Sequence, residues 1–167
     1  LYAPTSEELA KGLSNTQVVA PQLVELVHTS DTSGITLRDL TFSYAAADFS
    51  SCLSGTCSAQ SASFLDTAAI HVENSHGFVL QNVSVVHVDG NGIWVGANSS
   101  EVTMDSLTVD DVGAGAVRIG PPTGGVSGPS RASLVSLTNS VLTNGGNIYP
   151  MGCGVLLQAG SNVTVSH

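Results

Sequence analysis

Apolar and polar residues alternate in short runs along the middle of the chain, and the pattern then repeats. Residues 69–92 read AIHVENSHGFVLQNVSVVHVDGNG, and residues 93–115 read IWVGANSSEVTMDSLTVDDVGAG. The matching apolar positions are Ile70 with Ile93, Val72 with Val95, Leu80 with Met104, Val83 with Leu107, and Val85 with Val109. A period of 23–24 residues, broken by Asn, Ser and Gly and lacking helical spacing, is typical of a solenoid built from strands.

Each repeat contains about three strand-sized segments, so we interpret one repeat as one coil of a parallel β-helix. A single coil cannot bury its inward side chains, which the coils on either side must cover. The sequence therefore predicts an all-β chain in which residues 1–167 form one domain. Ile70, Val72, Leu80, Val83 and Val85 are expected inside.

The flanking segments predict a few departures from this pattern. Residues 6–11 have the acidic first turn of a short helix that Gly12 ends, and Leu23–Val27 is predicted as a strand. Residues 45–67 and 121–132 are too long and too rich in small residues for a coil corner, so both are interpreted as loop excursions.

The end of the chain leaves a coil half made. An open coil end exposes unpaired strand groups and apolar side chains. We therefore expect the chain to be part of a longer solenoid. Residues 155–167 should contact further β-coil from the parent chain or from a neighbouring subunit.

Cys52 and Cys57 lie five residues apart in the first excursion, with Gly55 between them. A local disulfide is the simplest interpretation, and it favours an oxidising compartment. A metal site is the weaker alternative, because neither a His nor a second Cys pair lies close in sequence. Cys153 is left over, either as a small buried apolar residue or as a partner for a thiol outside this chain. We expect no metal and no cofactor.

Three sequons, at Asn82, Asn98 and Asn162, lie at or beside predicted turns. Together with the cysteines they favour a secreted or cell-surface glycoprotein. Asn82 has an alternative role, because Asn at a corner between strands is also a common left-handed turn residue.

Only 10% of the residues are charged, which suits strands and turns better than ionic helices. Four Lys and Arg against 13 Asp and Glu give a formal charge of −9. Nucleic acid is therefore not expected as a partner, and anionic membrane surfaces are disfavoured. The sequence has no apolar run long enough to predict a membrane span.

Superposition of the repeats places His87, Asp111 and Asn144 at one position in successive coils. With Asp110 and Asp89 close by, such a polar ladder brings carboxylates to spacings that suit glycoside hydrolysis. The alternative is that these side chains are corner residues that cap strand ends.

Trp94 and Arg118 are expected to point outward from a sheet. Trp94 is a candidate sugar-stacking surface, and Arg118 would contact a sugar or pair with an acid. His71 and His76 are interpreted as surface residues.

Several pieces carry a resemblance: VVAPQLVELV (18–27), LTFSYA (40–45), GNGIWVG (90–96), DVGAGAVRIG (111–120) and GGNIYPMGCGVLLQ (145–158). In order and spacing the chain resembles the right-handed parallel β-helix proteins related to glycoside hydrolase family 141. The resemblance implies a right-handed coil and carbohydrate-active relatives of the fucosidase and xylanase type. It assigns a catalytic role to no numbered residue, because the family's acidic pair is expected on later coils.

The sequence therefore leaves two alternative functions. The first is a secreted or cell-surface β-helix glycoprotein that binds or processes polysaccharide. The second is a non-catalytic, rod-like component of an extracellular filament, wall or surface assembly.

Overall fold

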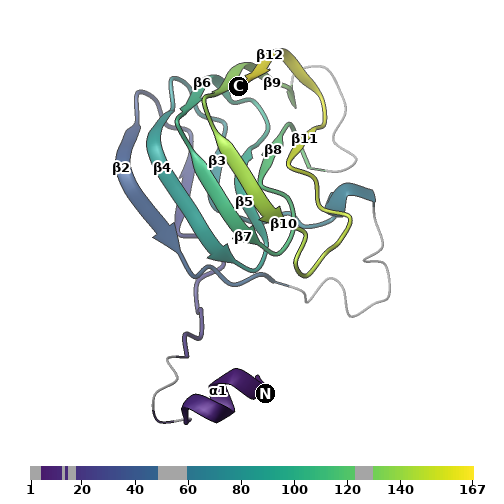
Figure 1. Cartoon of the computed structure of the whole chain (residues 1–167). Helices are drawn as coiled ribbons and strands as arrows, with labels where there is room; N and C mark the ends of the chain where they lie inside the picture. The colour runs from purple at the N-terminus through teal and green to yellow at the C-terminus, as the bar shows by residue number, and fades with distance from the viewer. Residues whose placement is uncertain (1–4, 13, 15–17, 49–59, 123–129) are drawn as a thin grey trace.

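A computed structural model of the chain describes residues 5–12, 14, 18–48, 60–122 and 130–167. Most of this part is β-structure, arranged as two parallel sheets that face each other across an apolar interior (Figure 1). In the described residues, no helix is long and apolar enough to cross a bilayer.

The first sheet contains five parallel strands in the order β1-β3-β5-β8-β11. Their bounds are Val27–Ser30 for β1, Ala68–Glu73 for β3, Asn91–Val95 for β5, Val117–Ile119 for β8 and Val155–Leu157 for β11. The second sheet has the order β10-β7-β4-β6-β9-β12, and β2 also pairs with β4. Its strands are β2 (Thr36–Ser43), β4 (Val79–Val88), β6 (Ser100–Asp105), β7 (Thr108–Val112), β9 (Ala132–Thr138), β10 (Val141–Gly145) and β12 (Gly160–Ser166).

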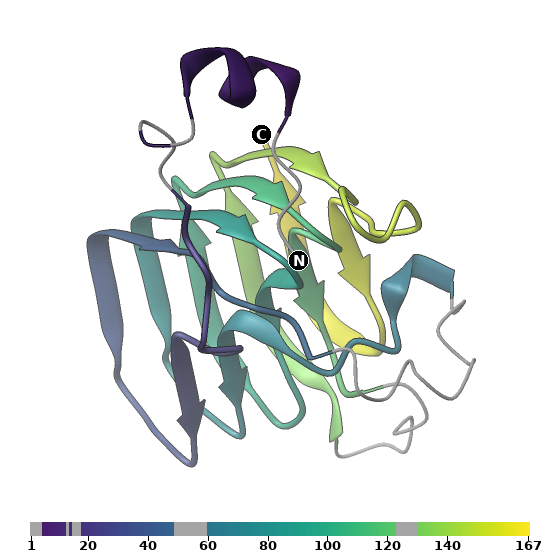
Figure 2. The ribbon, with the colours of Figure 1, turned by 90° about the horizontal axis from the view of Figure 1, so that it is seen from below.

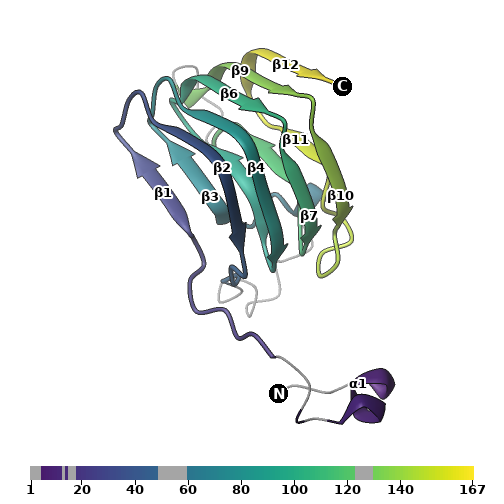
Figure 3. The ribbon, with the colours of Figure 1, turned by 60° about the vertical axis from the view of Figure 1, so that its left-hand side comes forward.

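The chain alternates between the two sheets, and we call one strand of the first sheet with the second-sheet strands that follow it one pass. Strand β4 is long enough to serve two neighbours, because its first half pairs with β6 and its second half with β7. Figure 3 shows the successive passes side by side, with β1 and β2 at one end and β11 and β12 towards the other.

The register between passes confirms the repeat seen in the sequence. Ile70 pairs with Ile93 and Val72 with Val95 in the first sheet. In the second sheet Leu80 pairs with Met104 and Val85 with Val109, one repeat later. The matched apolar residues therefore lie beside one another on neighbouring strands.

The interior is filled by these same positions. The predicted core residues Ile70, Val72, Leu80, Val83 and Val85 are at most 1% exposed, which confirms the prediction for them. They pack in one cluster with the equivalent residues of the next passes. Burial of aliphatic side chains from every pass is the main favourable contribution to such a fold.

Residues with left-handed backbone conformation recur at the bends of successive passes. The register aligns them in four columns: Asp31, Asn74 and Asn98; Asp39, Asn82, Ser106 and Asn139; Tyr44, His87, Asp111 and Asn144; and Glu101, Leu134 and Asn162. Asn and Asp tolerate this conformation better than other residues with a side chain. Several of them bond across passes, as in the 2.7 Å hydrogen bond from Asn82 Nδ2 to Asp39 Oδ1.

The N-terminal region is only partly as predicted. Helix α1 spans Ser6–Lys11, with Thr5 and Glu8 as a capping box, and lies beyond the ends of β2 and β4 (Figure 1). Strand β1 begins only at Val27, so the strand predicted over Leu23–Val27 is misplaced. The physical reason is pairing, because the hydrogen bonds to β3 begin at Leu26, whereas Leu23 remains 62% exposed.

Both predicted excursions lie partly outside the described residues. In the described part of residues 45–67, the chain has a short 3-10 turn, η3 (Gln60–Ala62), and no strand, and Figure 2 shows this segment along the side of the sheets. Strand β9 already begins at Ala132, the last residue of the second predicted excursion. Cys52 and Cys57 lie outside the described residues, whereas Cys153 is a half-buried free thiol.

Candidate functional site

A cleft of about 650 Å³ lies where the strands of the second sheet end. We call it the strand-end cleft. Residues from four passes line it, together with the segment before β1 and a residue of α1. The lining residues that matter below are Tyr44, His87, Asp89, Asp111, Asn147 and Ile148.

The column of left-handed corner residues that contains Tyr44, His87 and Asp111 supplies the polar wall of the cleft. His87 Nδ1 lies 2.7 Å from Oδ2 of Asp111 on the next pass. On the other side, the His87 ring stacks on Tyr44 with 5.5 Å between centroids. All three side chains remain accessible, since Tyr44 is 44% exposed and the side chains of His87 and Asp111 are about half exposed.

The two adjacent aspartates have separate roles. The second oxygen of Asp111 accepts a 2.6 Å hydrogen bond from Asn147 Nδ2. Asp110 is not among the lining residues, and it accepts hydrogen bonds from Thr143 and Asn144 at 2.8 Å each. These bonds hold the pKa of Asp110 below its usual range, because they stabilise the carboxylate.

Asp89 is a half-buried carboxyl group of the cleft. Burial raises its pKa, and the negative charge of Asp111 raises it further. Asp89 therefore keeps its proton to a higher pH than an ordinary aspartate. A raised carboxyl pKa is what a general acid for cleavage of a glycosidic bond requires.

The predicted polar ladder of His87, Asp110, Asp111 and Asn144 is present only in part as a set of direct contacts. His87 and Asp111 are in contact, as the superposed repeats place them, whereas Asn144 bonds to Asp110 instead. The aspartates that line the cleft are Asp89 and Asp111, together with Glu8 of α1, and Asp110 is not among the lining residues.

Sequence reasoning missed Tyr44 and Asn147. Tyr44 had a usable signal, because β2 pairs with β4 in a register that carries Phe42 to Val85 and thus Tyr44 to His87. The segment LTFSY already matches VSVVH in its apolar positions. Asn147 had none, since it follows β10 in a loop whose course depends on bonds to Val112 and Gly113.

Trp94 and Arg118 occupy the face of the first sheet that points away from the apolar core. Both are nevertheless buried, at 2% and 1% exposure, so Trp94 offers no open ring face. Arg118 lies over the indole at 4.2 Å from its centroid and donates to the Leu65 carbonyl oxygen at 2.6 Å. It also forms an ion pair with Asp66 at 3.3 Å.

Alternation along β5 predicts only the side of the sheet on which Trp94 lies, and not what covers it. The indole contacts His71 and Arg118 on the two neighbouring strands, and Arg118 in turn bonds to Leu65 and Asp66, which lie far away in sequence. The acid-paired role of Arg118 is the one that the structure shows.

The three sequon asparagines are all exposed and in left-handed conformation. Asn82 differs from the others, because its Nδ2 donates to Asp39. That nitrogen is the atom to which a glycan would be attached.

Comparisons with models of protein families, with curated proteins and with solved structures find no match to this chain.

Proposed function

We propose that this chain is part of a secreted or cell-surface right-handed parallel β-helix glycoprotein that binds or processes polysaccharide in the strand-end cleft. The observation that carries the proposal is the presence of Asp89 and Asp111 in one cleft, with the pKa of Asp89 raised and the ring of Tyr44 exposed.

The chemistry of the cleft suits a sugar chain. Aromatic rings stack on the apolar face of a pyranose, while carboxylates and amides bond to its hydroxyl groups. Tyr44 supplies the ring, Asp111 the carboxylate and Asn147 the amide. If the cleft also hydrolyses its ligand, Asp89 is the candidate acid and Asp111 the candidate base or nucleophile.

The experiment is a titration of the protein with neutral and acidic soluble oligosaccharides, monitored by calorimetry. We expect at least one to bind, and Tyr44→Ala and Asp111→Asn each to weaken its affinity about tenfold. Leu134→Ala is the control, since Leu134 is 51% exposed and does not line the cleft. Absence of binding, or equal affinities in all variants, would refute the proposal.

Hydrolysis is tested separately on the oligosaccharide that binds. Asp89→Asn should abolish release of reducing ends and leave affinity nearly unchanged, because it removes the proton donor and keeps the shape. Binding without any hydrolysis by the unmodified protein would make the cleft a binding site alone.

A second candidate function, a rod-like element of an extracellular assembly, is favoured by the outer strands. Leu40, Leu157 and Val165 are 44–55% exposed on strands that lack a further parallel neighbour in the described part of the chain. Such edges favour addition of more β-coil, from the parent chain or a neighbouring subunit. In that case the polar columns serve only to hold the corners together.

A further inference from the structure

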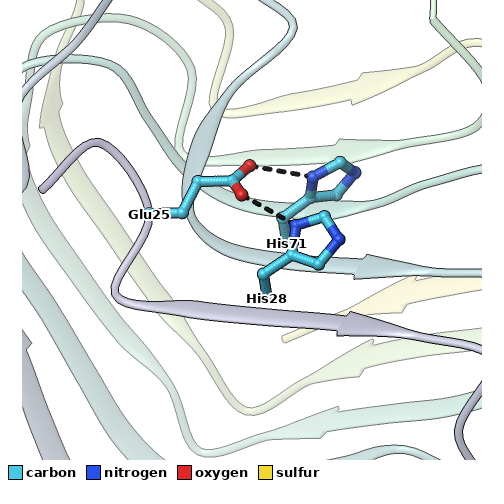
Figure 4. A group of neighbouring side chains, drawn as sticks. All are labelled: Glu25, His28 and His71. Atoms are coloured by element: carbon cyan, nitrogen blue, oxygen red, sulfur yellow. Dashed lines mark hydrogen bonds and ion pairs between the residues drawn. The ribbon is translucent and has the colours of Figure 1, made fainter.

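Glu25, His28 and His71 come together on the outer face of the first sheet (Figure 4). Glu25 Oε2 lies 2.7 Å from His28 Nδ1, and Glu25 Oε1 lies 2.9 Å from His71 Nδ1. Each residue offers one ligand atom, and the three atoms lie within 4.8 Å of one another. The cluster shares no residue with the strand-end cleft.

The pairing of β1 with β3 creates this cluster. His28 and His71 are register partners on neighbouring strands, and Glu25 lies three residues before His28. Because 46 residues separate Glu25 from His71, no local motif announces the site. The expectation that the chain binds no metal rested on local spacing alone.

His71 is buried and its ring is packed against a neighbour, so its interpretation as a surface residue is wrong. It is 6% exposed, and its ring stacks on Trp94 at 4.2 Å with an interplanar angle of 3°. Its Nε2 atom is buried and has no hydrogen-bond partner in the described part of the chain. The nitrogen that His71 turns toward the cluster is the other one, Nδ1, which contacts Glu25 (Figure 4).

We propose that Glu25, His28 and His71 bind a divalent transition-metal ion such as zinc. Two imidazoles and one carboxylate form a common zinc ligand set that leaves a further position for water. The His28 side chain is 45% exposed, so the ion can enter from solvent. Trp94 acts as a positioning residue, since its stacking fixes the His71 ring.

The charges around the cluster favour a cation. Glu25 lies between the two imidazoles, and the negative charge of Glu73 also acts on His71. The guanidinium of Arg118 lies over Trp94, and Asp66 pairs with it.

A bound ion would join three parts of the chain. Glu25 belongs to the segment before β1, His28 to the outermost strand of the first sheet, and His71 to the next strand. The ion would therefore fasten the outer strand β1 to the body of the sheet. Any ligand that binds only the folded state also raises the unfolding temperature.

The test uses the purified protein without a polyhistidine tag, stripped of metal by chelation. Zn²⁺ is titrated in competition with a chromophoric chelator, and thermal unfolding is followed with and without one equivalent of the ion. We expect one Zn²⁺ per chain and an unfolding temperature that stops rising at one equivalent. Co²⁺ should give the visible absorption of a four- or five-coordinate site.

Variants at the cluster separate this site from general surface binding. Glu25→Gln keeps the shape of the side chain, and His28→Ala changes an exposed one; each should weaken Zn²⁺ binding at least tenfold. His76→Ala is the matched control, because His76 lies 3.2 Å from Glu101 in an exposed pair that is not part of such a three-ligand group. It should leave the affinity unchanged.

Two results would overturn the proposal. One is the absence of stoichiometric Zn²⁺ binding by the unmodified protein. The other is an equal loss of binding in Glu25→Gln, His28→Ala and His76→Ala, which would show adventitious binding by surface histidines. Far-ultraviolet circular dichroism of each variant confirms that a lost affinity is not lost folding.

Discussion

The imidazole of His71 and the indole of Trp94 stack at 4.2 Å between centroids and 3° between planes, although they lie one repeat apart in the sequence. Their strands pair directly, with His71 opposite Trp94 and Trp94 opposite Arg118. Parallel in-register pairing brings equivalent side chains of successive passes face to face. The outer face of the first sheet therefore carries a stacked column of rings and a guanidinium.

Removal of the central ring of this column should destabilise the fold. We expect Trp94→Ala to lower the free energy of unfolding by about 3–5 kcal/mol, the usual cost of deleting a buried large aromatic side chain. Trp94 is 2% exposed, and its Nε1 donates a 2.8 Å hydrogen bond to the Gly120 carbonyl oxygen. Because Trp94 is the only tryptophan, its removal leaves no tryptophan fluorescence to follow. Urea denaturation is therefore monitored by circular dichroism.

Trp94→Phe is the control for the hydrogen bond. It keeps an aromatic ring for stacking and loses the indole N–H, so a loss of about 1–2 kcal/mol is expected. Equal effects of Phe and Ala would mean that stacking contributes little.

Gly113 should tolerate no side chain. A Cβ atom there would lie 1.9 Å from the backbone oxygen of Asp89 on the neighbouring pass. Gly113→Ala must therefore push two backbones apart, and we expect a loss of about 3 kcal/mol or more in the free energy of unfolding. Gly154→Ala is the matched control, because a Cβ atom there meets nothing within 4 Å.

Thermal and chemical unfolding of both glycine variants measure these effects. A loss below about 1 kcal/mol for Gly113→Ala would contradict the close approach of the two passes.

The repeat in residues 69–115 was predictable because the register between its passes is regular. Ile70 and Ile93 share one periodic environment, so their match in the sequence reports a contact in space. The start of β1 was not predictable in the same way. Leu23–Val27 has the composition of a strand, but where the strand begins depends on its pairing with β3, which lies more than 40 residues later in the sequence.

The candidate sites also differ in whether their residues lie in the repeating part of the chain. His87 and Asp111 occupy repeating corners, so superposition of the repeats places them together. The bonds of Arg118 to Leu65 and Asp66 and the meeting of Glu25 with His71 depend on non-repeating segments. Local alternation gives the side of a sheet on which a residue lies, but not what covers it.

The raised pKa of Asp89 predicts a pH-dependent stability. Below the ordinary pKa of an aspartate, the carboxyl is protonated in both folded and unfolded chains and adds no pH dependence. As the pH rises above about 4, the unfolded chain loses this proton before the folded chain does, so Asp89 lowers the free energy of unfolding. Asp89→Asn should therefore equal the unmodified protein near pH 3.5 and exceed it in stability at pH 7.

Asp110→Asn should show the opposite sign. Hydrogen bonds from Thr143 and Asn144 lower the pKa of Asp110, so its carboxylate adds stability above the ordinary pKa. This variant should be less stable than the unmodified protein at pH 7 and approach it at low pH. Urea midpoints across the pH range compare the three proteins, and parallel curves would contradict both assignments.

The sequons should differ in occupancy when the protein is made through a eukaryotic secretory pathway. Asn98 and Asn162 are exposed corner residues, whereas the Nδ2 atom of Asn82 already bonds to Asp39. We expect glycans at Asn98 and Asn162 and none at Asn82, as measured by peptide mapping before and after enzymatic deglycosylation. Asp39→Ala should increase modification at Asn82, because it frees that nitrogen.

The outer strands β11 and β12 present core positions without a cover. Leu157 pairs with Ile119 and Val165 with Leu137, and both partners are buried in the apolar interior. Leu157 and Val165 are nevertheless 52% and 55% exposed, because no described strand lies beyond them. They have the register of interior residues and the exposure of surface residues.

Unpaired strand groups beside uncovered aliphatic side chains favour pairing with another strand edge. We therefore expect the 167-residue chain to self-associate through this end, with a mass that increases with concentration in sedimentation velocity. Leu157→Lys and Val165→Lys should each shift the distribution towards monomer, because a charge cannot be buried in the contact. Leu134→Lys, which places the same charge at an exposed residue of β9, should not. A cooperatively unfolding monomer at all concentrations would contradict this prediction and show that the edge is stable by itself.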